Sequence, residues 1–202
     1  MTLRLRNTFI AAAIVAALFH VPVGANAQNN RWLPYEGHMA VHFAIDHNGM
    51  SLTRGTFREL TGELTFDESN PETSQLSVQI ESASLDTGHS YRDSFVRGPQ
   101  FLDAAKHRFI TFKSTKVSKT GDKTGIVTGD LTMRGVTKPV TLNVSFIKKS
   151  KRPSGEDYMG FSATAALNRL DWDITAFSSK SPPAITGEVI DMVISGEFVR
   201  QK

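Results

Sequence analysis

Apolar and polar residues alternate with a period of two along most of the chain. Such alternation is typical of strands that bury one face and expose the other. Turn-forming pairs such as Asn48-Gly49 and Arg134-Gly135 separate the alternating runs. The pattern predicts an all-β domain of about eight antiparallel strands, in a sandwich or in a barrel of the size that can hold one small ligand. The runs lie at 38–46, 60–67, 76–80, 110–112, 127–133, 140–146, 159–167 and 190–198.

One segment departs from the strand pattern. Ser90 and Asp93 have the spacing of a capping box, with the serine at the N-cap and the carboxylate three residues later. Tyr91 and Phe95 would share one face of the helix that follows, and Gly98-Pro99 would end it. We therefore expect a short helix near 91–97, in a crossover where it could plug one end of a barrel.

The first 27 residues have the parts of a cleaved secretory signal in their usual order. Arg4 and Arg6 precede an apolar run of 11 residues from Phe9 to Phe19, and Ala25-Asn26-Ala27 follows. A membrane anchor is disfavoured because a bilayer crossing needs ~20 apolar residues. We expect residues 1–27 to be removed and residues 28–202 to form one domain in the periplasm or outside the cell.

Charge and composition narrow the classes of function. The formal net charge is +3, and Arg4 and Arg6 supply two of those charges, so the mature domain is nearly neutral. A nearly neutral chain predicts no nucleic-acid partner. The sequence has no cysteine, which excludes thiolate nucleophiles and thiolate zinc sites. It also has no nucleophile elbow, phosphate-binding glycine loop or His-Glu-x-x-His motif, so we predict no catalytic residues, metal or cofactor.

The block at 129–140, Gly-Asp-Leu-Thr-Met-Arg-Gly-Val-Thr-Lys-Pro-Val, resembles the signature of the YceI-like polyisoprenoid-binding proteins. The resemblance extends over roughly 35–199. It implies a single eight-stranded, antiparallel, lipocalin-like barrel with a short helix in one crossover, exported, with an apolar cavity for isoprenoid or other long amphiphilic chains. This chain has Arg108 where the family usually has Pro, and Asp173 where it usually has Gly. Shorter matches follow in the family's order at His38, Phe43, His47, Gly55-Thr56-Phe57, Asp86-Thr87, Arg92-Asp93, Phe101-Leu102-Asp103, Gly160-Phe161 and Asn168-Arg169.

Strand parity and the resemblance together predict the wall of that cavity. Large residues such as Phe112 share the inward faces with small ones such as Gly129, Ala163 and Ala165. A tube wide enough for a ligand needs small residues in its wall, although a filled core also alternates large and small. The residues expected to line the cavity are Phe43, Ile45, Phe57, Leu64, Val78, Ile80, Phe95, Phe101, Phe112, Leu131, Leu142, Val144, Phe161, Ala163, Leu167 and Ile194.

Three polar residues are candidates for contact with the polar head of a ligand. His47 stands at a strand end, where a cavity mouth would be, and Arg92 lies on the predicted helix. Arg169 has the inward parity, so its guanidinium needs a carboxylate or a ligand head group as partner. A structural histidine and a solvated arginine are the alternative interpretations of His47 and Arg92. The basic run at 148–152 is either an exposed hairpin tip or a site of attraction to anionic lipid, worth about 1 kcal/mol per residue.

The function expected from these features is an exported binding protein that holds a polyisoprenoid, a quinone tail or a fatty amide for transport, storage or stress protection. Ten buried carbons yield about 8 kcal/mol against an association cost of ~4–15 kcal/mol, so we expect a chain of twenty or more carbons. The sequence does not decide whether the protein contacts a membrane peripherally or forms a homodimer. The alternatives are an enzyme acting on an isoprenoid or lipid, and a haem or metal barrel using His38, His42, His47, His89 or His107.

Overall fold

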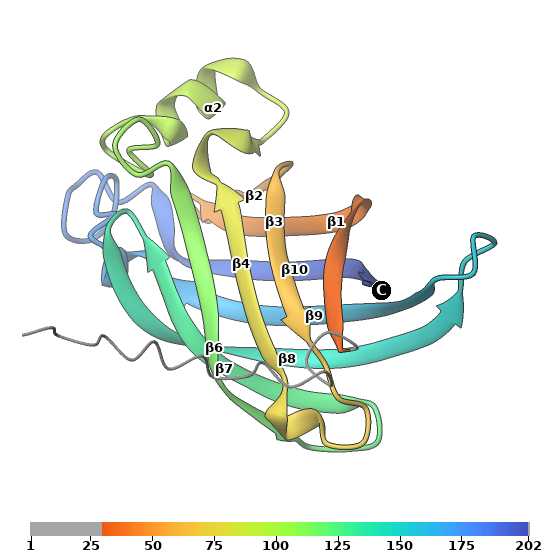
Figure 1. Ribbon diagram of the computed structural model, residues 1–202. Helices are drawn as coiled ribbons and strands as arrows, with labels where there is room; N and C mark the ends of the chain where they lie inside the picture. The colour runs from red at the N-terminus through yellow and green to blue at the C-terminus, as the bar shows by residue number, and fades with distance from the viewer. Residues whose placement is uncertain (1–29, 202) are drawn as a thin grey trace, which may run out of the picture.

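The computed structural model describes residues 30–201, which form a closed barrel with one short helix at one end (Figure 1). The predicted leader at 1–27 lies outside the described residues. The strands are β1 (Arg31–His47), β2 (Ser51–Phe57), β3 (Leu60–Thr65), β4 (Gln75–Glu81), β5 (Leu85–Asp86), β6 (Phe109–Lys119), β7 (Thr124–Met133), β8 (Val136–Lys151), β9 (Asp157–Asn168) and β10 (Thr186–Arg200). The helices are the α-helix α2 (Ser90–Arg97) and the 3-10 turns η1 (Pro71–Thr73), η2 (Ser82–Ser84) and η3 (Arg169–Trp172).

The ten strands make an eight-stranded antiparallel barrel, as predicted. Both β2 and β3 pair with β1, at its C-terminal and N-terminal ends respectively, so together they form one long barrel strand. In the same way β4 pairs with β3 while the short β5 pairs with β2. The first and last strands close the barrel, with Val41 opposite Ile194. Closure leaves most backbone groups paired and removes the exposed edges of an open sheet.

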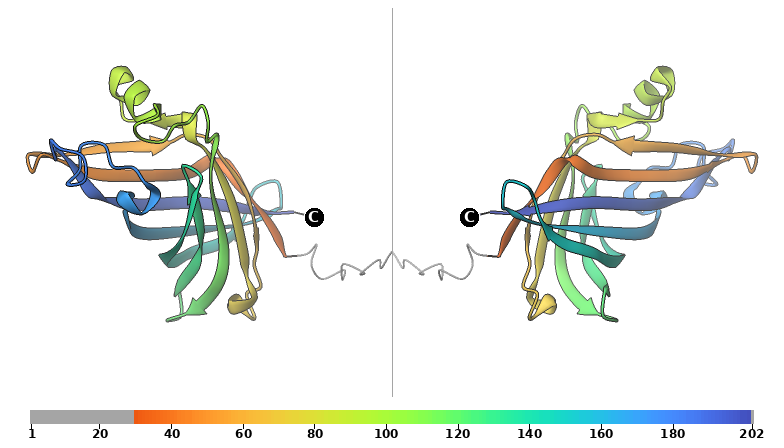
Figure 2. Two further views of the ribbon diagram at one scale, coloured as in Figure 1. Left: turned by 90° about the vertical axis from the view of Figure 1, so that its left-hand side faces the viewer. Right: turned by 90° about the vertical axis from the view of Figure 1, so that its right-hand side faces the viewer.

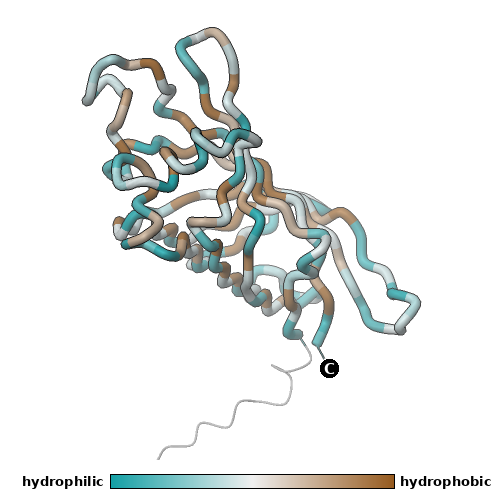
Figure 3. The backbone as a smooth tube through the Cα atoms, turned by 90° about the horizontal axis from the view of Figure 1, so that it is seen from above, coloured by the Kyte–Doolittle hydropathy of each residue, from teal (hydrophilic) through white to brown (hydrophobic). Residues whose placement is uncertain are grey.

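Seven of the eight predicted runs lie wholly in strands, and the run at 60–67 extends two residues beyond β3, because alternation decides which face of each strand is buried. Figure 3 shows hydrophobic and hydrophilic residues mixed along the barrel strands. The prediction missed β2, whose Leu-Thr-Arg-Gly sequence lacks a clear alternation, and the two-residue β5. It also stopped β6 too early. A register shift between Ser114 and Lys116 changes the parity there, so Val117 pairs with Val127 on the inner face.

Helix α2 is present, but its predicted cap is wrong by one residue. His89 is the N-cap, and its side chain accepts a hydrogen bond from the Arg92 backbone N–H. The Asp93 carboxylate turns away from the helix end and accepts hydrogen bonds from the backbone N–H and hydroxyl of Thr87, at 2.8 and 2.6 Å. Asp93 therefore fastens the helix to the preceding loop. Within residues 30–201 no helix has the length and apolar character of a membrane span.

Two tight turns agree with the sequence signals. Asn48 and Gly49, with φ of 57° and 68°, are the central residues of the turn between β1 and β2, which Met50 closes by donating to the His47 carbonyl, and Arg134 and Gly135 join β7 to β8 with φ of 51° and 77°. Positive φ at both central residues is the requirement of a type I′ hairpin turn, whose twist matches that of the strands. The β1–β2 hairpin projects from the barrel beside the segment that precedes β10 (Figure 2).

Asp173, where glycine was expected from the resemblance, adopts the left-handed conformation with φ of 57° at the end of η3. The left-handed region costs a side chain about 1–2 kcal/mol, whereas glycine loses about 0.5–1 kcal/mol of extra entropy on folding. We expect Asp173→Gly to raise the free energy of unfolding by about 0.5 kcal/mol. Urea unfolding measures this change. Asp171→Gly is the control. Because Asp171 lies within η3, this substitution should lower the free energy of unfolding. Equal changes in the free energy of unfolding for the two variants would contradict the interpretation.

Candidate functional site: the apolar cavity of the barrel

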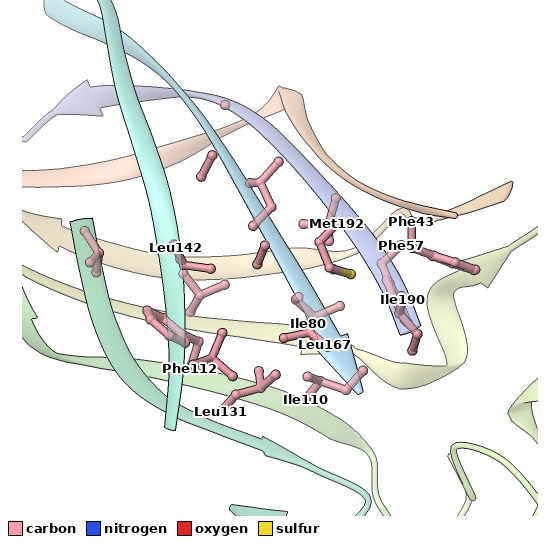
Figure 4. Close-up of a pocket in the computed structure, with 18 of the residues that line it drawn as sticks. Phe43, Phe57, Ile80, Ile110, Phe112, Leu131, Leu142, Leu167, Ile190 and Met192 are labelled. Carbon is pink, nitrogen blue, oxygen red and sulfur yellow. The ribbon is translucent and has the colours of Figure 1, made fainter. Parts of the chain in front are cut away.

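The barrel encloses a cavity of about 610 Å³. That volume falls in the range of known small-molecule sites, about 300–1,000 Å³. Its wall is mostly aliphatic and aromatic, with side chains from almost every strand. Figure 4 shows Phe112 and Leu131 on one side of this space and Phe43, Phe57, Ile190 and Met192 on another. A site with this lining binds an apolar molecule by excluding water from it.

The structure places every predicted site residue in the cavity wall, both the sixteen apolar positions and His47, Arg92 and Arg169. Their contact with a ligand stays a prediction. The cavity wall also contains residues that were not predicted: a second group whose strand parity points inward, and Phe177, which comes from the segment between η3 and β10. Parity alone would have found most of these additional wall residues, which include Met39, Leu60, Phe66, Leu76, Ile110, Met133, Val140, Phe146, Ile190, Met192 and Phe198.

Small residues serve the cavity in two different ways. Ala163 and Ala165 line it directly, as predicted. Gly129 does not, because a Cβ at this position would lie 2.4 Å from the Phe112 ring and 2.5 Å from a backbone oxygen. Gly55 makes the same room for the Phe43 ring. These glycines let an aromatic ring lie flat across the neighbouring strand, so they shape the wall without widening the space itself.

Aromatic rings gather at both ends of the cavity. At the α2 end, the Phe95 ring lies 5.4 Å from Phe101 and 5.8 Å from Phe177. At the other end, Phe161 contacts Phe66, Phe146 and Phe198, with ring centroids 5.4–6.1 Å apart. Packed aromatic rings of this kind bury a large apolar surface and exclude water. The two clusters therefore limit the length of the apolar space.

Arg169 is the most deeply buried charged group at the cavity wall, with 1% of its surface exposed. Of the two partners expected for it, a carboxylate or a ligand head group, no carboxylate lies within 4.0 Å among residues 30–201. Its guanidinium instead donates to three backbone carbonyls, those of Ile174 at 2.6 Å, Gly187 at 2.7 Å and Thr186 at 3.0 Å. Burial lowers the pKa of Arg169 below its ordinary value, and the charge of Glu188 opposes that effect. An arginine satisfied by neutral carbonyls keeps its positive charge and gives the apolar cavity one polar end.

Arg92 and His47 stand nearer to solvent at the same end. Arg92 is half-buried and donates to the hydroxyl of Thr87 at 2.8 Å and to its carbonyl at 2.9 Å. His47 is exposed at the last position of β1. The three polar candidates therefore share the cavity wall but have different environments, and only Arg169 is closed off from water.

The chain matches the YceI-like domain family over residues 32–198. The protein belongs to the YceI-like family. Among curated relatives, a UPF0312 protein of Pseudomonas putida is 40% identical over 199 residues, which are 98% of this chain and all of the relative. A UPF0312 protein of Ectopseudomonas mendocina is 43% identical over 81% of this chain and 83% of its own.

Solved structures show the same YceI-like barrel. BcnA of Burkholderia cenocepacia superimposes with a TM-score of 0.73 at 20% identity, over 81% of this chain and 98% of its own. A Campylobacter jejuni YCEI protein has a TM-score of 0.68 at 27% identity, over 76% and 88%. A polyisoprenoid binding domain from Saccharophagus degradans has a TM-score of 0.62 at 14% identity, over 85% and 98%. At such identities the first and third comparisons establish the fold.

The basic run at 148–152 of this YceI-like protein is largely neutralised by its own carboxylates. Lys149 pairs with Glu68 at 2.7 Å, and Lys151 with Asp157 at 2.9 Å. Arg152 lies 3.6 Å from its own partner, Glu156. The hydrogen bond from Lys151 is the main cause that lowers the pKa of Asp157 below its ordinary value. Since three of the four cations in the run have a carboxylate partner, the exposed hairpin tip is the favoured interpretation of this run.

The five histidines considered for a haem or metal site are spread over the described part of the barrel. His38 lies 3.3 Å from Glu197, His89 caps α2, and His107 packs against Gly135. Within residues 30–201 no three histidine or carboxylate side chains come together as a metal site. Arg108, which stands where proline was expected, precedes β6 and pairs with Glu81 at 3.1 Å.

Proposed function

We propose that this YceI-like protein is an exported carrier or store for one long apolar chain, such as a polyisoprenoid, a quinone tail or a fatty amide. The observation that carries the proposal is the 610 Å³ apolar cavity inside a closed barrel. The polyisoprenoid binding domain from Saccharophagus degradans, which has the same fold, supports the same class of ligand. The leader-like sequence at 1–27 supports a periplasmic or secreted location, where the protein would transport, store or protect lipid.

The cavity volume sets the expected length of the chain. A methylene takes about the ~30 Å³ of a water molecule in the liquid, so the cavity holds on the order of twenty carbons. Burying twenty carbons yields about 16 kcal/mol, which exceeds the ~4–15 kcal/mol cost of association. Ten carbons would leave little or no surplus. The protein should therefore discriminate strongly against short chains.

Arg169 supports a ligand whose polar end accepts hydrogen bonds. Its three carbonyl partners do not neutralise its charge, so a carbonyl or anionic oxygen at the end of the cavity would gain a favourable interaction there. Quinones and fatty amides both carry such an oxygen. Arg92 and His47, closer to solvent, would lie beside any larger head group.

We expect purified protein to release a colourless lipid of about twenty or more carbons on organic extraction. Native mass spectrometry should show the corresponding one-to-one complex, and reloaded n-alkyl amides should bind about fourfold more tightly per added methylene up to that length. A flat dependence on chain length would contradict the proposal. Turnover of the extracted lipid would favour the enzyme alternative, and a Soret absorption band would favour a haem barrel.

A further inference from the structure

Exposed apolar side chains gather around the α2 end of the cavity. Met50 and Leu52, in the β1–β2 hairpin, are 83% and 47% exposed. On α2, Tyr91 is 77% exposed and Phe95 is 37% exposed. We call these four residues the mouth rim. The hairpin and the helix both project beyond the neighbouring strands (Figure 2).

The segment before β10 joins the two parts of the mouth rim. The Asn48 backbone N–H, in the hairpin turn, donates to the Ile185 carbonyl at 2.9 Å. At the other side, the Phe177 ring packs 5.8 Å from Phe95 on α2. Phe95, Phe177 and Ile185 also line the cavity. The exposed apolar surface is therefore continuous with the apolar interior of the barrel.

The charges beside the mouth rim favour an anionic partner. Arg54, Arg92 and Lys180 have no carboxylate within 4.0 Å among residues 30–201. Two acids lie near these cations: Asp46 accepts a hydrogen bond from the Gly49 N–H, and Glu188 accepts one from Ser179 and interacts through its charge with Lys180 and Arg169. The opposite end of the barrel differs, because its cations at 148–152 are mostly paired. Apolar tips flanked by cations that form no salt bridge are typical of surfaces that bind the interface of an anionic membrane.

We propose that the mouth rim docks on an anionic phospholipid bilayer, so that the lipid passes between bilayer and cavity without crossing water. This inference rests on the proposed function, since it concerns how the same cavity is loaded. Each methylene that crosses water slows the exchange about fourfold. A chain of the expected length would exchange extremely slowly through solution, whereas contact between rim and bilayer removes that barrier.

The experiment compares vesicle binding by two matched variants. Met50→Ser/Leu52→Ser/Tyr91→Ser removes the exposed rim and leaves out Phe95, which packs in the cavity. Ile147→Ser is the control, because Ile147 is 54% exposed but lies next to Phe146, whose N–H binds Lys123 at the far end of the barrel. Co-flotation uses phosphatidylcholine vesicles with and without phosphatidylglycerol. We expect the triple variant to lose on the order of tenfold in partitioning per residue, and the control to bind as the unchanged protein does.

A second measurement separates docking from ligand binding. The fluorescent fatty acid cis-parinaric acid, added without vesicles, reports whether the cavity is intact. Unchanged fluorescence with lost flotation in the triple variant supports the proposal. If the unsubstituted protein binds the probe but does not float with the vesicles, the docking proposal is overturned and the proposed function still stands. If the unsubstituted protein floats with the vesicles but takes up no probe, docking is supported and the proposed binding of lipid in the cavity is overturned. If the triple substitution leaves vesicle flotation unchanged but converts a dimer to a monomer in sedimentation, the mouth rim contacts a second copy of the chain and docking is overturned.

Discussion

Ala163→Trp is expected to exclude long-chain lipid from the barrel while leaving the protein folded. Ala163 lies on the inner face of β9, opposite Val144 of β8 and Ile194 of β10, and it lines the cavity. If the indole displaces about five methylenes at ~0.8 kcal/mol each, affinity falls on the order of a thousandfold. Because the ring enters open space, the free energy of unfolding of the lipid-free protein should change little.

The matched control is Thr164→Trp, one residue further along the same strand. Thr164 is exposed on the outer face, so its ring should leave lipid content unchanged. Lipid extraction and urea unfolding are measured on both variants. A filled core at Ala163 would instead cost about 1–3 kcal/mol through overpacking. Severe destabilisation, or undiminished lipid content, would show that no ligand space exists at this position.

Arg169→Met should destabilise the protein by about 3 kcal/mol or more. Methionine cannot donate to the carbonyls of Ile174, Thr186 and Gly187, which receive the three guanidinium hydrogen bonds. Each buried acceptor left without a partner costs about 1–3 kcal/mol, and burial of the methionine side chain offsets only part of that. The segment that carries Phe177 should loosen first, since Arg169 ties both of its ends. Urea unfolding and hydrogen exchange of residues 174–187 check these two effects.

Arg92→Met provides the comparison for Arg169→Met. Arg92 is only half-buried, and its bonds go to one residue, Thr87, so the same substitution should cost less than about 1 kcal/mol. If both substitutions lower the free energy of unfolding equally, the three hydrogen bonds from Arg169 to backbone carbonyls do not stabilise the barrel. Loss of ligand affinity in Arg92→Met without loss of stability would support its place beside the ligand head.

Most of the fold could be predicted from the sequence because one physical signal, burial of alternate residues, repeats in every barrel strand. The signal fails where that alternation fails. β2 has Arg54 and Gly55 in place of an apolar series, and it belongs to the barrel because β1 supplies its partners. In β6, the irregularity between Ser114 and Lys116 shifts the parity, so the rest of the strand looked polar. Both cases depend on contacts between residues distant in the sequence.

The candidate site likewise contains some residues that could be predicted from the sequence and others that could not. Inward parity placed Phe43, Phe112 and Ala163 in the wall, because a strand position has only two faces to choose from. Phe177 has no such constraint, since it lies outside regular structure with a positive φ of 53°. The partners of Arg169 were missed for another reason: they are backbone carbonyls, which every residue carries and no sequence pattern reveals. Side-chain chemistry can therefore be read from the sequence more readily than main-chain chemistry.

Closure of the barrel by its first and last strands also affects when those strands can pair during folding. Val41 reaches its partner Ile194 only after nearly the whole chain is available, so β1 waits unpaired on that side until β10 arrives. Pairings between residues so distant in the sequence make folding slow, on the scale of milliseconds to seconds. For the export that we propose, slow closure would leave time for the chain to cross a membrane before the barrel forms.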